Sequence, residues 1–323
     1  MGVFKMTDKE RSIIDVHTHL GDILYDDGCG IIHQQGLPDR NLFDTGFKLR
    51  NVLDAGWYAG LLKYKHKGDQ PPEFIREWGT YSNRQRNFVA SLENMQKSLD
   101  ASRVQYTCCL PIPPYVTFEN MREAALVDSR VIPFTGIDFS DEIMMRDLEN
   151  IFSRQVHEGA RGMKIHPIVQ NISLQDHRVR NAVKFFGVHG LPVLFHSGVT
   201  SYYHGAEKVK QQPRYGNISD AEDLVIHFPS VPFIVGHAGG IEVDEVIEKL
   251  PRYDNVFVDT SFQSPEHITA LVHAFGSERV LFASDWPYGD RKKSIQMVRE
   301  ACKGNSEMEE RIFFSNSARL LKM

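Results

Sequence analysis

Short runs of apolar residues recur along the chain, and each run ends in polar residues, glycine or proline. The runs are rich in Val, Ile and Phe, and most are continuous rather than alternating, which is typical of parallel strands covered on both faces. Strands are therefore predicted in eight places, at residues 13–19, 104–110, 131–137, 162–166, 192–196, 232–237, 256–259 and 280–285.

The segments between these runs show helical periodicity. Apolar residues recur with the spacing of one helix face within 179–186, 243–250 and 268–275. Ser264, which precedes a proline, is typical of a helix start. Ser219, with a glutamate three residues later, predicts a capping box and hence a second helix start.

Strands that alternate with helices in this way favour an α/β protein with a (β/α)8 TIM barrel. A doubly wound open sheet is the alternative that alternation alone leaves open. The length suits one such domain over residues 1–323. Residues 21–90 break the rhythm before the helix predicted at 91–101, and we interpret them as a mostly helical insertion over the barrel mouth.

Composition narrows the class of protein. The 323 residues are 41% hydrophobic and carry a formal net charge of −5, and the basic residues are scattered, which argues against binding to nucleic acid or to a membrane surface. No apolar run approaches the roughly 18 residues of a membrane span. The four cysteines form no CxxC pair, which predicts reduced thiols in a cytoplasmic protein.

Candidate chemistry begins with His17 and His19, which close the first predicted strand. Side chains two residues apart in a strand point to the same face. Two imidazoles on one face can chelate a divalent metal, because neutral histidine is a preferred zinc ligand. The structural alternative is a pair of packed core histidines.

Later strands also end in residues that bind metals or transfer protons. These residues are Lys164, His166, His196, His237 and Asp285. The C-terminal ends of barrel strands meet at one mouth, so these side chains are expected to converge there. Each has a structural alternative: the histidines could be packed in the core, Asp285 could cap a loop, and Lys164 could form an ordinary ion pair.

Five segments together resemble the amidohydrolase superfamily, and within it the group of TIM-barrel metal-dependent hydrolases that includes aminocarboxymuconate-semialdehyde decarboxylase. The matching segments are Asp15-Val-His17-Thr-His19, Gly162-Met-Lys164-Ile-His166-Pro167, Leu194-Phe-His196-Ser-Gly198, Val235-Gly-His237-Ala-Gly-Gly240 and Ala283-Ser-Asp285-Trp-Pro287. The resemblance covers the predicted barrel but not residues 21–90.

The resemblance implies a metal centre with either one or two ions. His17, His19 and Asp285 would bind one metal ion, zinc or alternatively manganese. In a mononuclear site His196 would complete the ligand set, and His237 would be a catalytic base or electrophile beside it.

A binuclear site would use the same strand ends differently. His196 and His237 would then hold the second metal, with Lys164 as a bridging carbamate. Without carbamate formation, Lys164 would form an ion pair or hold a substrate carboxylate. In either arrangement Asp285 would also act in catalysis, because it can accept a proton from metal-bound water, whose pKa falls to about 7 on zinc.

Four further residues, together with His166, are predicted to contact a small-molecule substrate. Tyr202, Tyr203 and Arg214 lie in the long loop 199–216 and could clamp an anionic substrate, with a solvated loop as the alternative. Trp286 follows Asp285 and is expected to line the pocket, with barrel packing as the alternative. His166 either faces the site or hydrogen-bonds to a residue that lines it.

Three functions fit these residues. The first is a metal-dependent hydrolase, in which metal-activated water attacks a C–N or C–O bond. The second is a non-oxidative decarboxylase of an aromatic or muconate-like acid. The third, a non-enzymatic binding protein on the same barrel, fits an intact ligand set poorly. Size and the resemblance together also predict a homodimer.

Overall fold

The strands occur at the eight predicted places. A computed structural model of the chain describes residues 12–26, 28–38, 84–203 and 205–323, so most of the predicted insertion lies outside the described residues. The strands are β1 (Ile14–Thr18), β2 (Tyr106–Cys109), β3 (Val131–Pro133), β4 (Thr135–Gly136), β5 (Met163–Ile165), β6 (Val193–His196), β7 (Phe233–Gly236), β8 (Val256–Asp259) and β9 (Val280–Leu281). All paired strands are parallel, as the continuous apolar runs predict.

The predicted third strand is split into β3 and β4 by Phe134. The strands form two sheets, one of β1, β2 and β3 and one of β4 to β9. β3 pairs with β2 and β4 pairs with β5, so the two sheets are joined through Phe134. At the other end, Val16 N–H donates to the Phe282 carbonyl at 3.0 Å, and Thr18 bridges Trp286. These contacts close the sheet into a barrel, and the open-sheet alternative is excluded.

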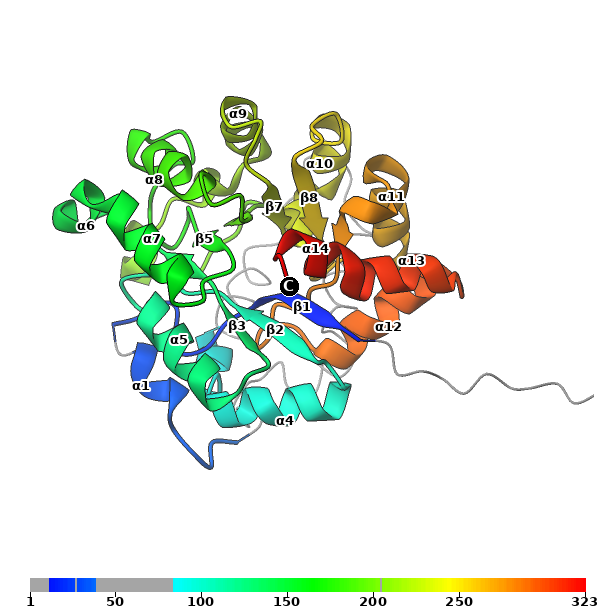
Figure 1. The fold of residues 1–323 in the computed structure, drawn as a ribbon, viewed down its shortest axis with the longest axis horizontal. Coiled ribbons are helices and arrows are strands. Elements are labelled where there is room, and N and C mark those ends of the chain that lie inside the picture. Colours follow the sequence, from blue (N-terminus) through cyan, green and yellow to red (C-terminus); the bar gives the residue numbers. More distant parts are fainter. Residues whose placement is uncertain (1–11, 27, 39–83, 204) are drawn as a thin grey trace, which may run out of the picture.

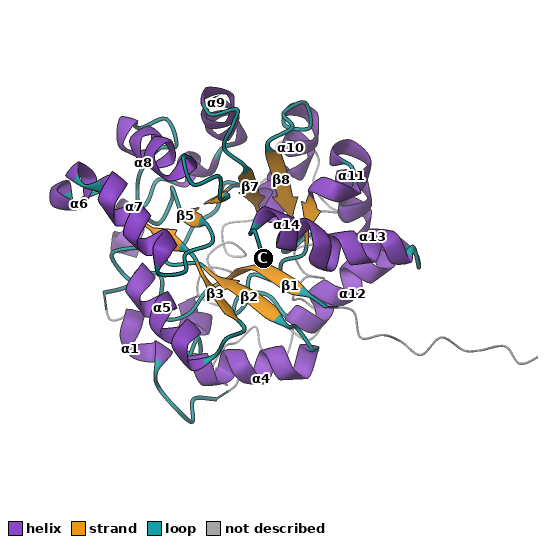
Figure 2. Ribbon diagram, in the orientation of Figure 1, coloured by secondary structure: helices purple, strands orange, loops and turns teal. Residues whose placement is uncertain are grey.

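Most of the helices surround the strands as an outer ring, while the last one, next to the C-terminus, lies over the end of the barrel (Figure 1, Figure 2). They are α1 (Gly28–Ile32), α4 (Leu92–Ser102), α5 (Phe118–Val127), α6 (Glu142–Arg146), α7 (Leu148–His157), α8 (His177–Gly187), α9 (Ile218–His227), α10 (Val243–Lys249), α11 (Pro265–Phe275), α12 (Arg291–Cys302), α13 (Ser306–Glu310) and α14 (Asn316–Leu320). No described helix has the length and apolar character that a membrane crossing requires.

Helix starts follow the local capping chemistry. Ser264 caps α11 by accepting from the His267 backbone N–H, as predicted. The prediction for α9 was wrong by two residues: the cap is Asn217, whose side-chain oxygen accepts from Asp220 N–H, and Ser219 lies inside the helix. An asparagine at this position offers the same oxygen to the free N–H groups.

The core has two apolar layers. The inner layer fills the barrel with strand residues, among them Ile14, Val16 and Leu194, and with Leu320 and Leu321 from the region of α14. The outer layer packs the opposite strand faces against the helices. Because apolar residues fill the barrel interior, the buried histidines of the site lie at the strand ends rather than in the middle of the barrel.

Candidate metal centre

The sequence-predicted histidines gather at the C-terminal ends of the strands. His17 is in β1, His196 ends β6, and His237 follows β7 directly. The ring centroids of His17 and His237 lie 4.6 Å apart, and those of His196 and His237 lie 4.9 Å apart. Lys164 of β5 joins them, with Nζ 3.0 Å from Nε2 of His17. All four side chains are buried.

A register shift in β1 sets the direction of His17. Asp15 pairs with Thr107, and Thr18 pairs with Cys109, so β1 has one more residue than β2 between these points. Such a bulge re-aims the side chains that follow it. As a result Thr18 hydrogen-bonds to Thr107, and Asp15 and Thr107 both hydrogen-bond to Arg291 on the outer side of the sheet. His17 instead points toward Lys164. Strict alternation would have placed Asp15 and His17 on the same face.

His17 and His19 each use one ring nitrogen to hold the ring in place. Nδ1 of His17 lies 2.7 Å from Oδ2 of Asp259, and Nδ1 of His19 lies 2.9 Å from the Leu110 carbonyl. Both partners are acceptors, so each neutral ring carries its proton on Nδ1. Burial lowers the pKa of both histidines well below 6.5, which keeps the rings neutral. Each Nε2 therefore has a free lone pair.

The two Nε2 lone pairs point toward the same carboxylate oxygen. Oδ1 of Asp285 lies 3.5 Å from Nε2 of His17 and 3.5 Å from Nε2 of His19. This oxygen is buried, and no hydrogen bond reaches it among the described residues. Apart from the Lys164 amine, whose Nζ lies 3.0 Å from Nε2 of His17, these acceptors face one another, and a cation among them would relieve their repulsion.

These three residues fit a divalent metal. Their ligand atoms lie within 4.8 Å of one another. Metal–ligand bonds of about 2.0–2.1 Å place the ligands of a tetrahedral ion ~3.4 Å apart, close to the separations observed. His17, His19 and Asp285 thus form a buried His/Asp group suited to one metal ion.

Asp285 and His237 have unusual backbone conformations. Their φ angles are 54° and 58°, in the left-handed region that residues other than glycine rarely adopt. Strain of this kind persists where the surrounding structure fixes it, and it is concentrated at functional sites. Burial raises the pKa of Asp285 well above 3.8, although the nearby Lys164 cation opposes the rise.

A hydrogen-bonded network around Asp259 supports the group. Oδ1 of Asp259 accepts from the His237 backbone N–H at 3.0 Å and from the Ser261 hydroxyl at 2.5 Å. Since that hydroxyl proton is used, Nδ1–H of His237 donates to Ser261 Oγ at 2.7 Å. The second possible ligand group, His17, His237 and Asp259, is therefore already joined by protons.

Asp259 and Ser261 were missed at the sequence level. Asp259 ends the predicted strand 256–259, so the strand-end rule that selected Asp285 would also have selected it. Its neighbour Ser261 lies two residues beyond the strand and has no comparable signal in the sequence.

The Lys164 amine is buried beside His17. Burial is the largest cause that lowers its pKa, to about 7, and the nearby Asp285 and Asp259 partly offset this effect. In the described structure its Nζ donates to the His17 Nε2 lone pair. A metal ion bound to Nε2 of His17 would therefore compete with Lys164 for this lone pair.

Two predicted substrate residues contact the cluster. The rings of His166 and His196 stack with centroids 4.3 Å apart and an interplanar angle of 8°. The Tyr202 hydroxyl lies 3.1 Å from Nε2 of His166 and 3.4 Å from Nδ1 of His196. Nε2 of His196 faces the Gly198 carbonyl at 3.1 Å, and His196 belongs to neither compact ligand group.

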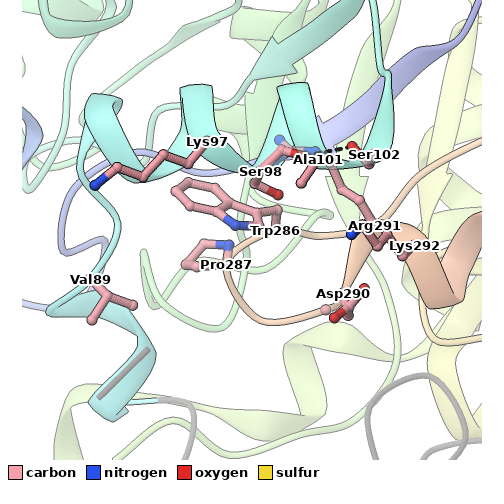
Figure 3. Close-up of a pocket in the computed structure, with 11 residues that line it drawn as sticks. Val89, Lys97, Ser98, Ala101, Ser102, Trp286, Pro287, Asp290, Arg291 and Lys292 are labelled. Carbon is pink, nitrogen blue, oxygen red and sulfur yellow. Dashed lines mark hydrogen bonds between the residues drawn. The ribbon is translucent and has the colours of Figure 1, made fainter. Parts of the chain in front are cut away.

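The other three predicted substrate residues lie elsewhere in the described structure. Tyr203 is buried, and its hydroxyl donates to the Leu24 carbonyl at 2.9 Å. Arg214 is exposed beside Tyr215. The Trp286 ring packs in the outer layer beneath α4, in the groove drawn in Figure 3.

Known proteins resemble this chain at the level of family and fold. The amidohydrolase family pattern matches residues 14–323. No curated protein sequence matches the chain. Among solved structures, 5-carboxyvanillate decarboxylase from Novosphingobium aromaticivorans, complexed with manganese, has a TM-score of 0.63 at 15% identity over 98% of this chain and 97% of that one.

Two further structures share the barrel. A 2,6-dihydroxybenzoate decarboxylase from Rhizobium has a TM-score of 0.62 at 12% identity, covering 97% of this chain and 99% of that one. A probable 2-pyrone-4,6-dicarboxylic acid hydrolase from Acinetobacter baumannii has a TM-score of 0.55 at 12% identity, covering 97% and 100%. Identities this low show the fold alone. The family match over residues 14–323, in a barrel with a buried His/Asp group at its strand ends, shows that the chain belongs to the amidohydrolase family.

Proposed function

We propose that this protein is a metal-dependent, non-oxidative decarboxylase of a small carboxylated aromatic or muconate-like acid. The observation that carries the metal centre is the convergence of two histidine lone pairs on Oδ1 of Asp285, a buried oxygen without a hydrogen bond. We assign His17, His19 and Asp285 as ligands of one ion, zinc or manganese, with His196 as the fourth ligand.

Two observations favour a single ion over a pair. The group of His17, His237 and Asp259 is held together by the proton on His17 Nδ1, and Nδ1–H of His237 is given to Ser261. A second ion in this group would have to displace the proton between His17 and Asp259. Lys164 then acts as a cation rather than as a bridging carbamate.

The charges of the site support an acidic substrate. A divalent ion would balance the charges of the Asp259 and Asp285 carboxylates, and the Lys164 amine beside them offers hydrogen-bond donors to a substrate carboxylate. Lys164 is the residue that we assign to hold the substrate carboxylate. Among the structures that share this fold, several are decarboxylases of aromatic acids, and one of these is a complex with 2,6-dihydroxybenzoate itself.

Decarboxylation requires one proton at the carbon that loses CO2. When bound, the metal supplies positive charge that polarises a substrate oxygen. We assign Asp285 to deliver the proton to that carbon, because it is the carboxyl group at the centre of the ligand set. His237 keeps Nδ1–H on Ser261, so its Nε2 is available to accept a proton from a substrate hydroxyl. The balance is one carboxylate and one proton converted to one C–H bond and CO2.

Hydrolysis is the second candidate, supported by the same residues and by the fold shared with the dicarboxylic acid hydrolase. Asp285 would then take the proton of the attacking water, and the substrate would be an amide, ester or lactone. The ligand geometry is compatible with both reactions, so the assay must separate them.

The test is turnover of two substrate panels by protein loaded with zinc or manganese. Carboxylated phenols and muconate-like acids are expected to release CO2 in equal amount to product, while amides, esters and lactones are unchanged. Hydrolysis without CO2 release would contradict the decarboxylase and establish the second candidate. Where a ligand histidine is replaced by alanine, His227→Ala is the matched control, because His227 is an exposed histidine on α9.

A further inference from the structure

One hydroxyl group bridges the two stacked imidazoles of the site. Tyr202 lies in the loop after β6, and its hydroxyl is within hydrogen-bond distance of both His166 and His196. The Tyr202 ring stands nearly perpendicular to the His166 ring, at 79° with centroids 5.0 Å apart, and it also meets the His196 ring edge-on. The loop thus contacts the two histidines through both the ring and the hydroxyl of Tyr202.

The direction of every hydrogen bond in this group follows from one backbone N–H. Val169 N–H can only donate, and it donates to Nδ1 of His166 at 3.3 Å. The neutral His166 ring therefore carries its proton on Nε2 and donates to Tyr202 Oη. The Tyr202 proton goes to Nδ1 of His196. His196 then carries its own proton on Nε2 and donates it to the Gly198 carbonyl.

This order leaves His196 without a free lone pair. Its Nδ1 accepts from Tyr202, and its Nε2 bears a proton. The order cannot simply reverse, because His166 would then direct a proton from Nδ1 against the N–H of Val169. The Nδ1 lone pair of His196 becomes available to a cation when the Tyr202 hydroxyl withdraws.

The loop that carries Tyr202 is held in this position from two sides. Gln211 is buried, and its Oε1 accepts from the Tyr202 backbone N–H at 2.7 Å while its Nε2 donates to Ser201 Oγ at 2.6 Å. The neighbouring Tyr203 hydroxyl ties the loop to the Leu24 carbonyl after β1. The fold therefore orders the loop before any ligand arrives.

We propose that Tyr202 is a positioning residue that competes with the metal for His196, so that entry of His196 into the ligand set is coupled to displacement of the Tyr202 hydroxyl. The proposal rests on the proposed metal centre. Its consequence is that two binding modes exist, one with His17, His19 and Asp285 alone, and a tighter one that includes His196.

The test measures the affinity of metal-depleted protein for Zn²⁺ and Mn²⁺ by competition with a chromophoric chelator. Tyr202→Phe keeps the ring and removes the hydroxyl, so it is expected to bind the metal roughly three- to tenfold more tightly, the value of one lost hydrogen bond. The same change in a His196→Ala background is expected to leave the affinity unchanged, because the Tyr202 hydroxyl then has no His196 imidazole for which to compete with the metal.

Tyr215→Phe, the same substitution at another tyrosine of the loop, is the matched control and is expected to leave the affinity unchanged. Weaker or unchanged binding by Tyr202→Phe would overturn the competition, as would an equal gain in the His196→Ala background. Failure of the wild-type protein to bind either ion would instead refute the metal centre, so the two failures are distinguishable. Substitution with Co²⁺ adds a direct readout: the visible spectrum of the Tyr202→Phe complex should show an added nitrogen ligand at subsaturating metal.

Discussion

Nδ1 of His17 lies 2.7 Å from Oδ2 of Asp259, and both side chains are fully buried. A carboxylate at this distance fixes the tautomer and orientation of the imidazole. The lone pair of His17 Nε2 therefore remains available for a metal, and a residue that does not touch the ion controls whether the ion can bind.

Asp259→Asn is expected to weaken metal binding by roughly ten- to a hundredfold while the fold is kept. The amide oxygen can still accept from the His237 and Ser261 N–H groups. The amide NH2 then faces His17 Nδ1 and moves the ring proton to Nε2, the nitrogen that must be free. Chelator competition measures the affinity, and thermal unfolding checks the fold. An affinity equal to that of the wild type would remove Asp259 from control of His17.

The barrel and most of its site could be predicted because parallel strands place all their ends at one mouth. The same rule covers Asp259, which ends the predicted strand 256–259 and was missed. The register shift in β1 has no signal in the apolar pattern, so the sequence could not predict that Asp15 and His17 point in different directions.

Loop residues were harder to predict because alternation rules do not apply there. Tyr202 and Tyr203 are adjacent, yet one reaches the histidines and the other the Leu24 carbonyl. Trp286 neighbours Asp285 but packs in the outer layer. Such differences depend on loop contacts such as that between Gln211 and Tyr202, which join residues through hydrogen bonds rather than through apolar periodicity.

His17→Ala is expected to remove most of the metal from the purified protein. The wild type should contain about one ion of zinc or manganese per chain, and the variant less than a tenth of that, because the ion loses one of the two imidazoles that chelate it from the end of β1. Elemental analysis by mass spectrometry provides the measurement, with His227→Ala as the control. Equal metal content in the His17 and His227 variants would contradict the assignment.

Lys164→Met distinguishes a single metal ion from a carbamate-bridged pair. The lysine donates to His17 Nε2 in the described structure, so its removal is expected to leave metal content at about one ion per chain. Turnover should fall through a higher KM for the acidic substrate, because the cation assigned to its carboxylate is lost. Loss of bound metal on this substitution would instead indicate a bridging role for Lys164.

Asp285→Asn is expected to reduce turnover by about 10²- to 10⁴-fold, the usual contribution of a proton-transferring group. The metal-depleted variant should nevertheless be more stable than the metal-depleted wild type at pH 8. Burial raises the pKa of Asp285 above its unfolded value, so the wild type is most stable below the unfolded pKa and loses stability as the pH rises toward the folded pKa.

The difference between the two proteins should therefore be large at pH 8 and small near pH 4. Urea unfolding in the presence of a chelator measures it at each pH. If the difference in the free energy of unfolding did not vary with pH, burial would not disfavour the ionised Asp285 carboxylate.

Asp15→Ala is expected to destabilise the barrel by about 3–5 kcal/mol. Oδ2 of Asp15 accepts from Arg291 Nε at 3.0 Å, and both side chains are buried, so the substitution leaves an uncompensated cation in the outer layer. The matched control is Asp100→Ala, which breaks an exposed pair with Arg130 and is expected to cost no more than about 1 kcal/mol. Free energies of unfolding from urea titrations compare the two. If both variants lost the same small amount, the Asp15–Arg291 pair would have no role in joining β1 to α12.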